Sequence, residues 1–223
     1  MKLIPYPDRD LMMLDLADML ASELADGLRR HDSVTFCVPG GTTPGPIFDV
    51  LSEQRLDWDR VVVMLNDERW VPETSDRSNA ALVRARLLTG RAAAATFLPF
   101  WRAEMTPEEA APGIAAAVRP HLPISVLLAG MGTDMHTASL FPGSAVLGEA
   151  LESHAPPVLA VPSETAGEAR ITLSGPVLSG AMSKHIVITG AAKREAIETA
   201  QDLPPHLAPI RTVLGGATVH WAP

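Results

Sequence analysis

The sequence predicts an α/β protein with three layers, in which a mostly parallel open sheet carries helices on both faces. Short apolar runs rich in β-branched residues, such as 34–38, 61–65 and 124–129, are typical of strands buried on both faces. Segments with helical spacing of apolar residues lie between these runs. Because strands and helices alternate along the chain, a parallel sheet covered by helices is the expected architecture.

The elements can be placed in chain order. The N-terminal half is expected to contain a helix at 10–30, a strand at 34–38, a turn at 39–46, a short helix at 47–51, a strand at 61–65, a polar loop at 66–78, and a helix capped by Ser78 or Asn79 and ending near 88. The C-terminal half is expected to contain a short strand at 96–100, a helix at 107–118, strands at 124–129, 170–174 and 185–189, a helix at 191–200, and a final edge strand at 218–221. Residues 144–169 are rich in proline and glycine, and predict loops with one short strand.

Composition limits the function. The chain has 223 residues and a formal charge of −8, so we expect a single domain over 1–223 and no binding to nucleic acid. It contains no apolar run of roughly 18 residues and no signal-peptide layout at its start, so no membrane association is expected. Cys37 is the only cysteine, which excludes an intrachain disulfide and thiolate metal sites. A cytoplasmic monomer or homodimer is the expected form.

Polar segments follow four of the predicted strands. They are Gly40–Thr43, Asp67–Arg69, Asp134 with His136, and Gly190 with Lys193. Because the carboxyl ends of parallel strands meet at one edge of a sheet, these segments should converge there, where ligands bind in open α/β sheets.

The glycine loop and two cations predict an anion site. Gly40 and Gly41 allow the backbone to approach an anion before a helix start, and Thr42 and Thr43 add hydroxyl donors. Lys193, in the first turn of a helix, could pair with a bound phosphate, and Arg170 opens a strand. The alternatives are a tight turn, a solvated lysine and a surface ion pair.

Asp134 and His136 predict acid–base chemistry. A carboxylate beside an imidazole fixes its tautomer and raises its basicity, as a general base for water requires. A structural histidine is the alternative, and Asp67–Arg69 alone could be a charged loop. The other histidines have no spacing that would bind a metal, so no metal site is expected. Ser139 has no nucleophile elbow around it, which leaves a covalent role unsupported.

Assembled in order, these motifs resemble the 6-phosphogluconolactonase family of the glucosamine-6-phosphate isomerase/lactonase superfamily, with its NagB/RpiA-like fold. The motifs are Gly40–Pro44, Asp67–Pro72 with Ser78–Asn79, Asp134–Gly143, Arg170–Leu173, and Gly190 with Lys193. The resemblance implies hydrolysis of 6-phospho-D-glucono-1,5-lactone, the second step of the oxidative pentose phosphate pathway. It implies a phosphorylated sugar lactone as the small-molecule partner, and no cofactor or metal.

The resemblance also assigns roles to residues. His136 would activate water, Asp134 would orient His136, and Arg69 would stabilise the oxyanion. Gly40, Gly41, Thr42, Thr43, Asp67, Arg170 and Lys193 would bind the substrate and its phosphate. Met135 stands where the family usually has glycine, so a positive φ there would strain the turn.

Two other functions remain open at this point. Related glucosamine-6-phosphate deaminases typically carry tyrosine at the position of Arg69 and glutamate at the position of Phe141, so this chain resembles the hydrolases more closely. A non-catalytic sugar-phosphate sensor would keep the glycine loop but tend to lose the base, whereas Asp134 and His136 are both present.

Overall fold

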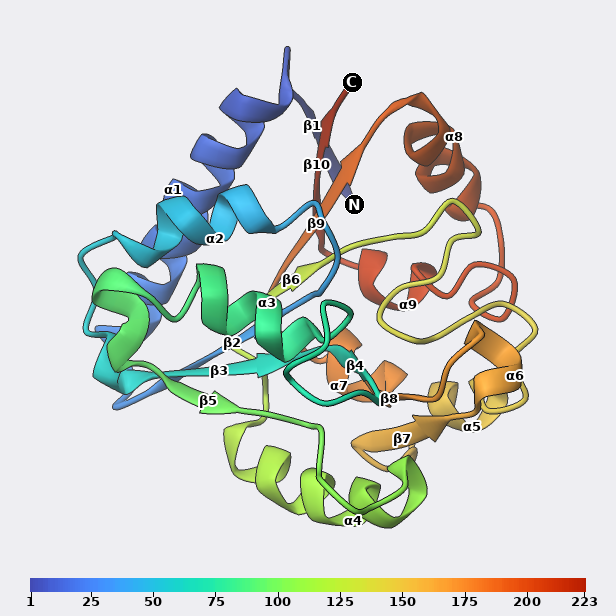
Figure 1. Cartoon of the computed structure of the whole chain (residues 1–223). Coiled ribbons are helices and arrows are strands. Elements are labelled where there is room, and N and C mark those ends of the chain that lie inside the picture. The colour runs from blue at the N-terminus through green and yellow to red at the C-terminus, as the bar shows by residue number, and fades with distance from the viewer.

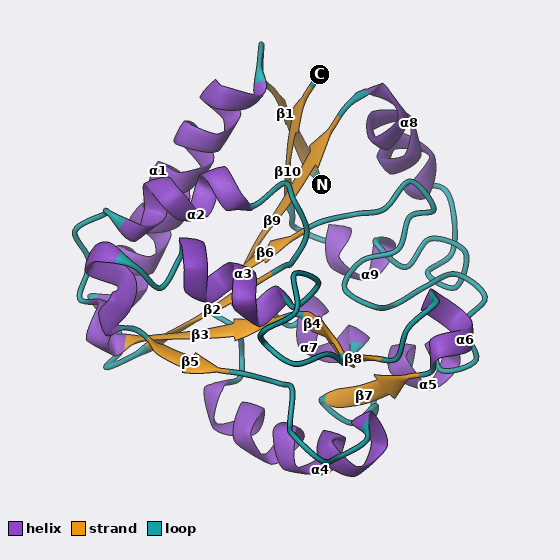
Figure 2. Ribbon diagram, in the orientation of Figure 1, coloured by secondary structure: helices purple, strands orange, loops and turns teal.

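A computed structural model describes residues 1–223 and confirms the mostly parallel α/β architecture (Figure 2). Seven strands form one wholly parallel sheet in the order β1-β10-β9-β6-β2-β3-β5. Their bounds are β1 Lys2–Pro5, β2 Val34–Val38, β3 Val61–Leu65, β5 Thr96–Leu98, β6 Val126–Ala129, β9 Ser183–Thr189 and β10 Thr218–Ala222. The central strands β2, β3 and β6 are entirely buried, as their continuous apolar runs predict.

The edge of this sheet differs from the prediction. Residues 218–222 form a strand, but β10 lies between β1 and β9 and is not an edge strand. The edge strand on this side of the sheet is β1, which the sequence did not indicate. Its four residues are too few to show a period, and they end in Pro5, which an edge strand tolerates.

A second sheet of three antiparallel strands lies beside the first, in the order β4-β8-β7. It consists of β4 Asp67–Arg69, β7 Val158–Val161 and β8 Arg170–Leu173. The prediction of a loop throughout 66–78 is therefore wrong at its start, because pairing with β8 makes a strand of three charged residues. The single short strand expected within 144–169 is β7, but the prediction of loops for the rest of this segment is wrong where two short helices form, Leu147–Leu151 and Ser163–Ala166. Each has only four or five residues, too few to show a helical period.

Helices surround the parallel sheet, and α1 and α2 lie on the opposite side of the strands from α8 and α9 (Figure 1). The helices are α1 Arg9–Leu28, α2 Gly45–Ser52, α3 Asn79–Arg86, α4 Pro107–Val118, α5 Leu147–Leu151, α6 Ser163–Ala166, α7 Gly175–Ser179, α8 Ala191–Ala200 and α9 Arg211–Leu214. Three short 3₁₀ turns span Trp58–Arg60, Gly90–Ala94 and Arg119–His121. Ser78 caps α3, and Thr106 with Glu109 forms a capping box on α4. No helix is long and apolar enough to cross a membrane.

A chain of polar side chains, buried at Tyr6, His185 and His220 and more exposed at its two carboxylates, joins the first and last strands to α1. The Tyr6 hydroxyl donates to Asp15 (2.6 Å) and contacts His220 Nδ1 (3.0 Å). His220 Nε2 contacts His185 Nδ1 (3.0 Å), and His185 Nε2 contacts Glu23 (2.9 Å). These contacts hold β9 and β10 in register, and β9 leads directly into the loop at Gly190.

Candidate active site

The loops after β2, β3, β6 and β9 converge on one cavity, as a parallel sheet requires. The cavity has a volume of about 260 Å³. Nine of the ten predicted site residues line it: Gly40, Gly41, Thr42, Thr43, Asp67, Arg69, His136, Arg170 and Lys193. The tenth, Asp134, lies outside the lining and reaches the cavity through its contact with His136.

The glycine loop is shaped by one close approach and one unusual backbone angle. A Cβ at Gly40 would overlap the amide of Asn79, so only glycine fits there. Gly41 has a φ of +87°, a conformation that glycine adopts readily. The loop then enters α2, whose start has no side-chain cap. The hydroxyls of Thr42 and Thr43 make no hydrogen bond within the chain, so they are free to bind a ligand.

The three charged residues of the short strand β4 alternate in direction: Asp67 and Arg69 line the cavity and Glu68 does not. Asp67 faces the cavity side and accepts a hydrogen bond from Ser139 Oγ (2.6 Å). Glu68 points away from the cavity and accepts from the backbone amides of Arg69, Asn79 and Ala80, which fixes the start of α3. Burial raises the pKa of Glu68 to about 6, although the hydrogen bonds from these backbone amides favour the charged carboxylate and lower it.

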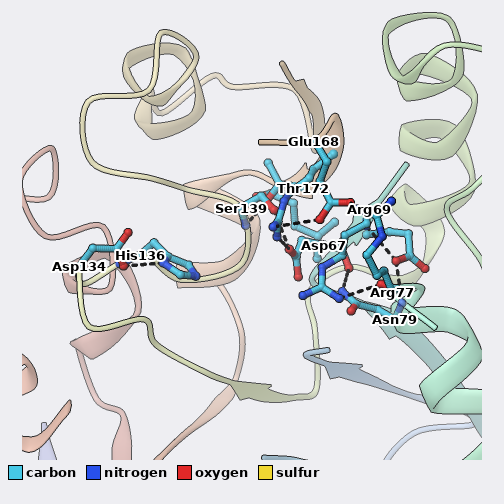
Figure 3. A network of polar contacts seen from close by, with 12 residues as sticks. Asp67, Arg69, Arg77, Asn79, Asp134, His136, Ser139, Glu168 and Thr172 are labelled. Carbon is cyan, nitrogen blue, oxygen red and sulfur yellow. Dashed lines mark hydrogen bonds and ion pairs between the residues drawn. The ribbon is translucent and has the colours of Figure 1, made fainter. Parts of the chain in front are cut away.

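Two arginines face each other across β4 and β8, because Arg69 and Arg170 are paired in the register. Arg69 Nη1 donates to the Arg77 carbonyl (2.7 Å; Figure 3). Arg170 Nη1 lies 3.8 Å from Asp67 Oδ2. Burial lowers the pKa of Arg170, Asp67 opposes this change and Arg69 adds to it. The Nε atoms of both arginines are buried without a partner in the chain. A molecule of net charge −8 thus concentrates positive charge at this wall.

Asp134 and His136 form a close pair in the loop after β6 (Figure 3). His136 Nδ1 lies 2.5 Å from Asp134 Oδ1, which leaves Nε2 as the free ring nitrogen. A Cβ at Gly132 would overlap both side chains, so the pair depends on this glycine. Met135 between them has a φ of +68°, the left-handed conformation expected of the family's glycine.

Phe141 and Ser139 complete this loop. The Phe141 ring packs against His136 with 4.5 Å between centroids, and the Arg170 guanidinium lies 5.4 Å from its centroid. Phe141 therefore fills the position next to the histidine with an apolar ring. Ser139 is fully buried, donates to Asp67 and does not line the cavity, which is not the position of a nucleophile.

Lys193 lines the cavity from the first turn of α8. Gly190 precedes this helix with a φ of +85°, and its carbonyl accepts from the Trp221 indole (2.9 Å). Lys193 is half-buried, and burial lowers its pKa. It makes no ion pair or hydrogen bond in the chain, so its ammonium group is available to an anion.

Sequence reasoning did not assign two asparagines to the cavity. Asn79 donates through Nδ2 to the Asp67 carbonyl (2.9 Å) and lies against Gly40. Asn66 immediately follows β3 and is 1% exposed. The only signal for Asn66 was its place directly before Asp67 at a strand end. Asn79 was predicted as a possible helix cap and as part of a family motif, with no role in the site.

The fold and this cavity define a class: an α/β protein with a cavity lined by two arginines and a lysine at the carboxyl edge of its parallel sheet. The family model for glucosamine-6-phosphate isomerases/6-phosphogluconolactonase matches residues 7–221. The chain belongs to this family.

Individual relatives agree with this assignment. A 6-phosphogluconolactonase of Mesorhizobium japonicum is 39% identical over 224 residues, covering 98% of this chain and 94% of the relative. One from Rhizobium meliloti is 40% identical, covering 93% of each. The crystal structure of a 6-phosphogluconolactonase from Shewanella baltica superposes with a TM-score of 0.95 at 32% identity, covering 100% of this chain and 97% of that one.

Proposed function

We propose that this chain hydrolyses 6-phospho-D-glucono-1,5-lactone to 6-phospho-D-gluconate, the second step of the oxidative pentose phosphate pathway. The observation that carries the proposal is the Asp134–His136 pair, whose free Nε2 belongs to the same cavity as an anion-binding loop. Relatives of at least 37% identity along nearly the whole chain are named for this activity. The enzyme needs no cofactor in this proposal.

The phosphate is anchored at the glycine loop. Backbone amides at Gly41 and the start of α2, with the hydroxyls of Thr42 and Thr43, are donors suited to phosphate oxygens. Lys193 supplies an unpaired cation beside them, and Arg170 has an unpartnered Nε. Gly40 shapes the turn, and anchoring the phosphate turns the lactone carbonyl toward the histidine.

Hydrolysis then proceeds by general-base catalysis. His136 Nε2 takes a proton from water as the water oxygen attacks C1, while Asp134 holds Nδ1 and stabilises the imidazolium. The tetrahedral intermediate collapses, the bond between C1 and the ring oxygen breaks, and the imidazolium returns its proton to that oxygen. The product is the open-chain acid. A general base of this kind contributes about 10²- to 10⁴-fold.

Charge develops on the carbonyl oxygen during attack. Arg69 lines the cavity with an unpartnered Nε, and the amides of the 130–136 loop lie beside His136. These donors stabilise the oxyanion in the proposed mechanism. Asp67, tied to Ser139 and close to Arg170, positions the arginine and contacts the substrate.

Phe141 favours hydrolysis over deamination. Deamination with isomerisation moves protons between carbons and the ring oxygen, which requires further acid–base groups. Phe141 offers none, and its ring packs directly against His136. A sensor is disfavoured because the pair Asp134–His136 is intact.

The test is hydrolysis of freshly generated lactone, coupled to NADP-dependent 6-phosphogluconate dehydrogenase, with spontaneous hydrolysis subtracted. We expect His136→Asn to lower kcat by about 10²-fold or more with a small change in KM. His154→Asn, at an exposed histidine, is the matched control. Near-normal turnover of His136→Asn would exclude the base role. Activity on glucosamine 6-phosphate alone would assign the chain to the deaminases, and inactivity on both substrates would favour a sensor.

The phosphate anchor is tested separately. We expect Lys193→Met to raise KM for the phosphorylated lactone by about 10- to 100-fold and to leave unphosphorylated glucono-1,5-lactone nearly unaffected. Lys2→Met on the exposed edge strand is the control. An equal loss with both lactones would show that Lys193 does not bind the phosphate.

The wider setting belongs to the same proposal. One domain over 1–223 carries the activity in the cytoplasm, as a monomer or homodimer. Its partner is the phosphorylated lactone, and the net charge of −8 argues against nucleic acid.

A further inference from the structure

Asn66 is held rigidly where three strands meet. It is the first residue after β3, its backbone amide donates to the Val38 carbonyl of β2 (3.0 Å), and its carbonyl accepts from the Leu173 amide of β8 (2.9 Å). The main chain is therefore fully paired on both sides. The side chain projects from a fixed backbone at the junction of the two sheets.

The carboxamide of Asn66 has no partner in the chain. Both Oδ1 and Nδ2 are buried without a hydrogen bond, and the residue lines the cavity together with Thr42, His136 and Arg170. Leaving both atoms of a buried amide unpaired costs folding free energy, so such a group normally has a partner. The neighbouring Asn79 uses its Nδ2 on a backbone carbonyl. The partner of Asn66 therefore lies in the cavity.

The chemistry of a carboxamide limits what that partner is. It presents a donor and an acceptor side by side. A phosphate dianion offers only acceptors and would leave Oδ1 facing negative charge. Two adjacent hydroxyls match the pair, since one accepts from Nδ2 while the other donates to Oδ1. The lactone ring carries hydroxyls at C2, C3 and C4, and every adjacent pair among them includes C3.

We propose that Asn66 is a specificity-determining residue that binds two neighbouring ring hydroxyls of the sugar lactone, one of them the C3 hydroxyl. The inference rests on the proposed function for its substrate class. Binding at both the phosphate end and the hydroxyl face fixes the ring relative to His136.

The test compares two lactones in two proteins. The substrates are 6-phosphogluconolactone and its 3-deoxy analogue, each made by oxidising the corresponding sugar 6-phosphate. For the wild type we expect kcat/KM to fall by roughly 10- to 100-fold when the C3 hydroxyl is absent. Asn66→Leu, similar in shape but apolar, should lose a similar factor on the parent lactone and discriminate the two lactones by less than about 3-fold. Asn66→Ala is the second variant, in case leucine impairs folding.

Two controls separate the explanations. Thr212→Val removes a hydroxyl that is equally buried and unpartnered but lies outside the cavity, and it should leave both kcat/KM values unchanged. Unphosphorylated gluconolactone should lose the same factor in Asn66→Leu as the phosphorylated lactone, unlike in Lys193→Met. Full discrimination retained in both Asn66 variants would overturn the proposal and leave a bound water as the only partner. A loss confined to phosphorylated lactones would overturn it too.

Failure of the proposed function would be visible separately, as a wild type that hydrolyses no lactone. The Asn66 proposal would then be read from calorimetric binding of 6-phosphogluconate and its 3-deoxy analogue. The wild type should bind 6-phosphogluconate more tightly than the 3-deoxy analogue, and Asn66→Leu should bind the two equally. The same preference in both proteins would reject the Asn66 proposal.

Discussion

Residue 135 has a left-handed backbone, with a φ of +68°, although it is a methionine. In an L residue this conformation brings Cβ close to the following carbonyl oxygen and costs roughly 1–2 kcal/mol, which glycine avoids. Two hydrogen bonds of 3.0 Å keep the turn in place, from the Met135 amide to the Gly132 carbonyl and from the Gly132 amide to the His136 carbonyl. We therefore expect glycine at position 135 to be more stabilising than alanine.

The informative comparison is Met135→Gly with Met135→Ala, because both variants lose the packing of the methionine side chain beyond Cβ against the core. The backbone cost favours glycine by roughly 1–2 kcal/mol, and the greater freedom of glycine in the unfolded chain opposes this by about 0.5–1 kcal/mol. The net difference in unfolding free energy is about 0.5–1 kcal/mol in favour of the glycine variant. In a chain of this length it corresponds to a melting temperature about 1–4 °C higher for the glycine variant.

Urea unfolding followed by circular dichroism, with calorimetry for the melting temperature, measures this difference. Ala116→Gly, at an exposed position within α4, is the control and should have the opposite sign, because glycine destabilises a helix by about 1 kcal/mol. A Met135→Ala variant at least as stable as Met135→Gly would refute the reasoning.

Three further predictions concern catalysis, acid stability and thiol reactivity. Gly132→Ala should lower kcat by about 10²-fold, because its Cβ would overlap the His136 ring and the Asp134 carboxylate; unchanged kinetics would contradict this. Burial and a neighbouring imidazole lower the pKa of His220 from 6.5 to about 4. The unfolded chain therefore takes up a proton that the folded state resists, and stability should fall by roughly 3 kcal/mol as the pH drops through this window. Urea midpoints should show a shallower pH dependence in His220→Gln, and equal slopes would count against the assignment. Burial raises the pKa of the Cys37 thiol well above its ordinary value, so a thiol reagent should label it only on unfolding, and rapid labelling of native protein would disprove this.

The parts of the fold that the sequence predicts well are those set by local pattern. The strands at 34–38 and 61–65 have the expected bounds, because continuous β-branched runs indicate burial on both faces. From these strands, parallel topology alone brings the glycine loop and the Asp134–His136 segment to one edge. The start of α4 is equally local, since Thr106 caps it.

The elements that the sequence did not predict depend on pairing with strands far away in the chain. β1 is a strand because it pairs with β10, more than two hundred residues later, and its own four residues carry no period. β4 is a strand because Asp67–Arg69 pairs with β8. That pairing also places Arg170 opposite Arg69 and near Asp67, which no local pattern could predict. The role inferred for Asn66 likewise follows from which of its atoms lack partners.

The chain of polar side chains from Asp15 to Glu23 depends on how many hydrogens its members can donate. Its four contacts, Asp15–Tyr6, Tyr6–His220, His220–His185 and His185–Glu23, require four hydrogens if each is a hydrogen bond. The tyrosine hydroxyl and two neutral imidazoles supply three, and the Ser183 hydroxyl, 3.2 Å from His185 Nε2, is a further donor at the Glu23 end. Tyr6, next to the first strand, and His220, in the last strand, are thus linked to His185 in β9. Contacts between the two ends of the polypeptide therefore help to align the strand that leads into the lysine loop.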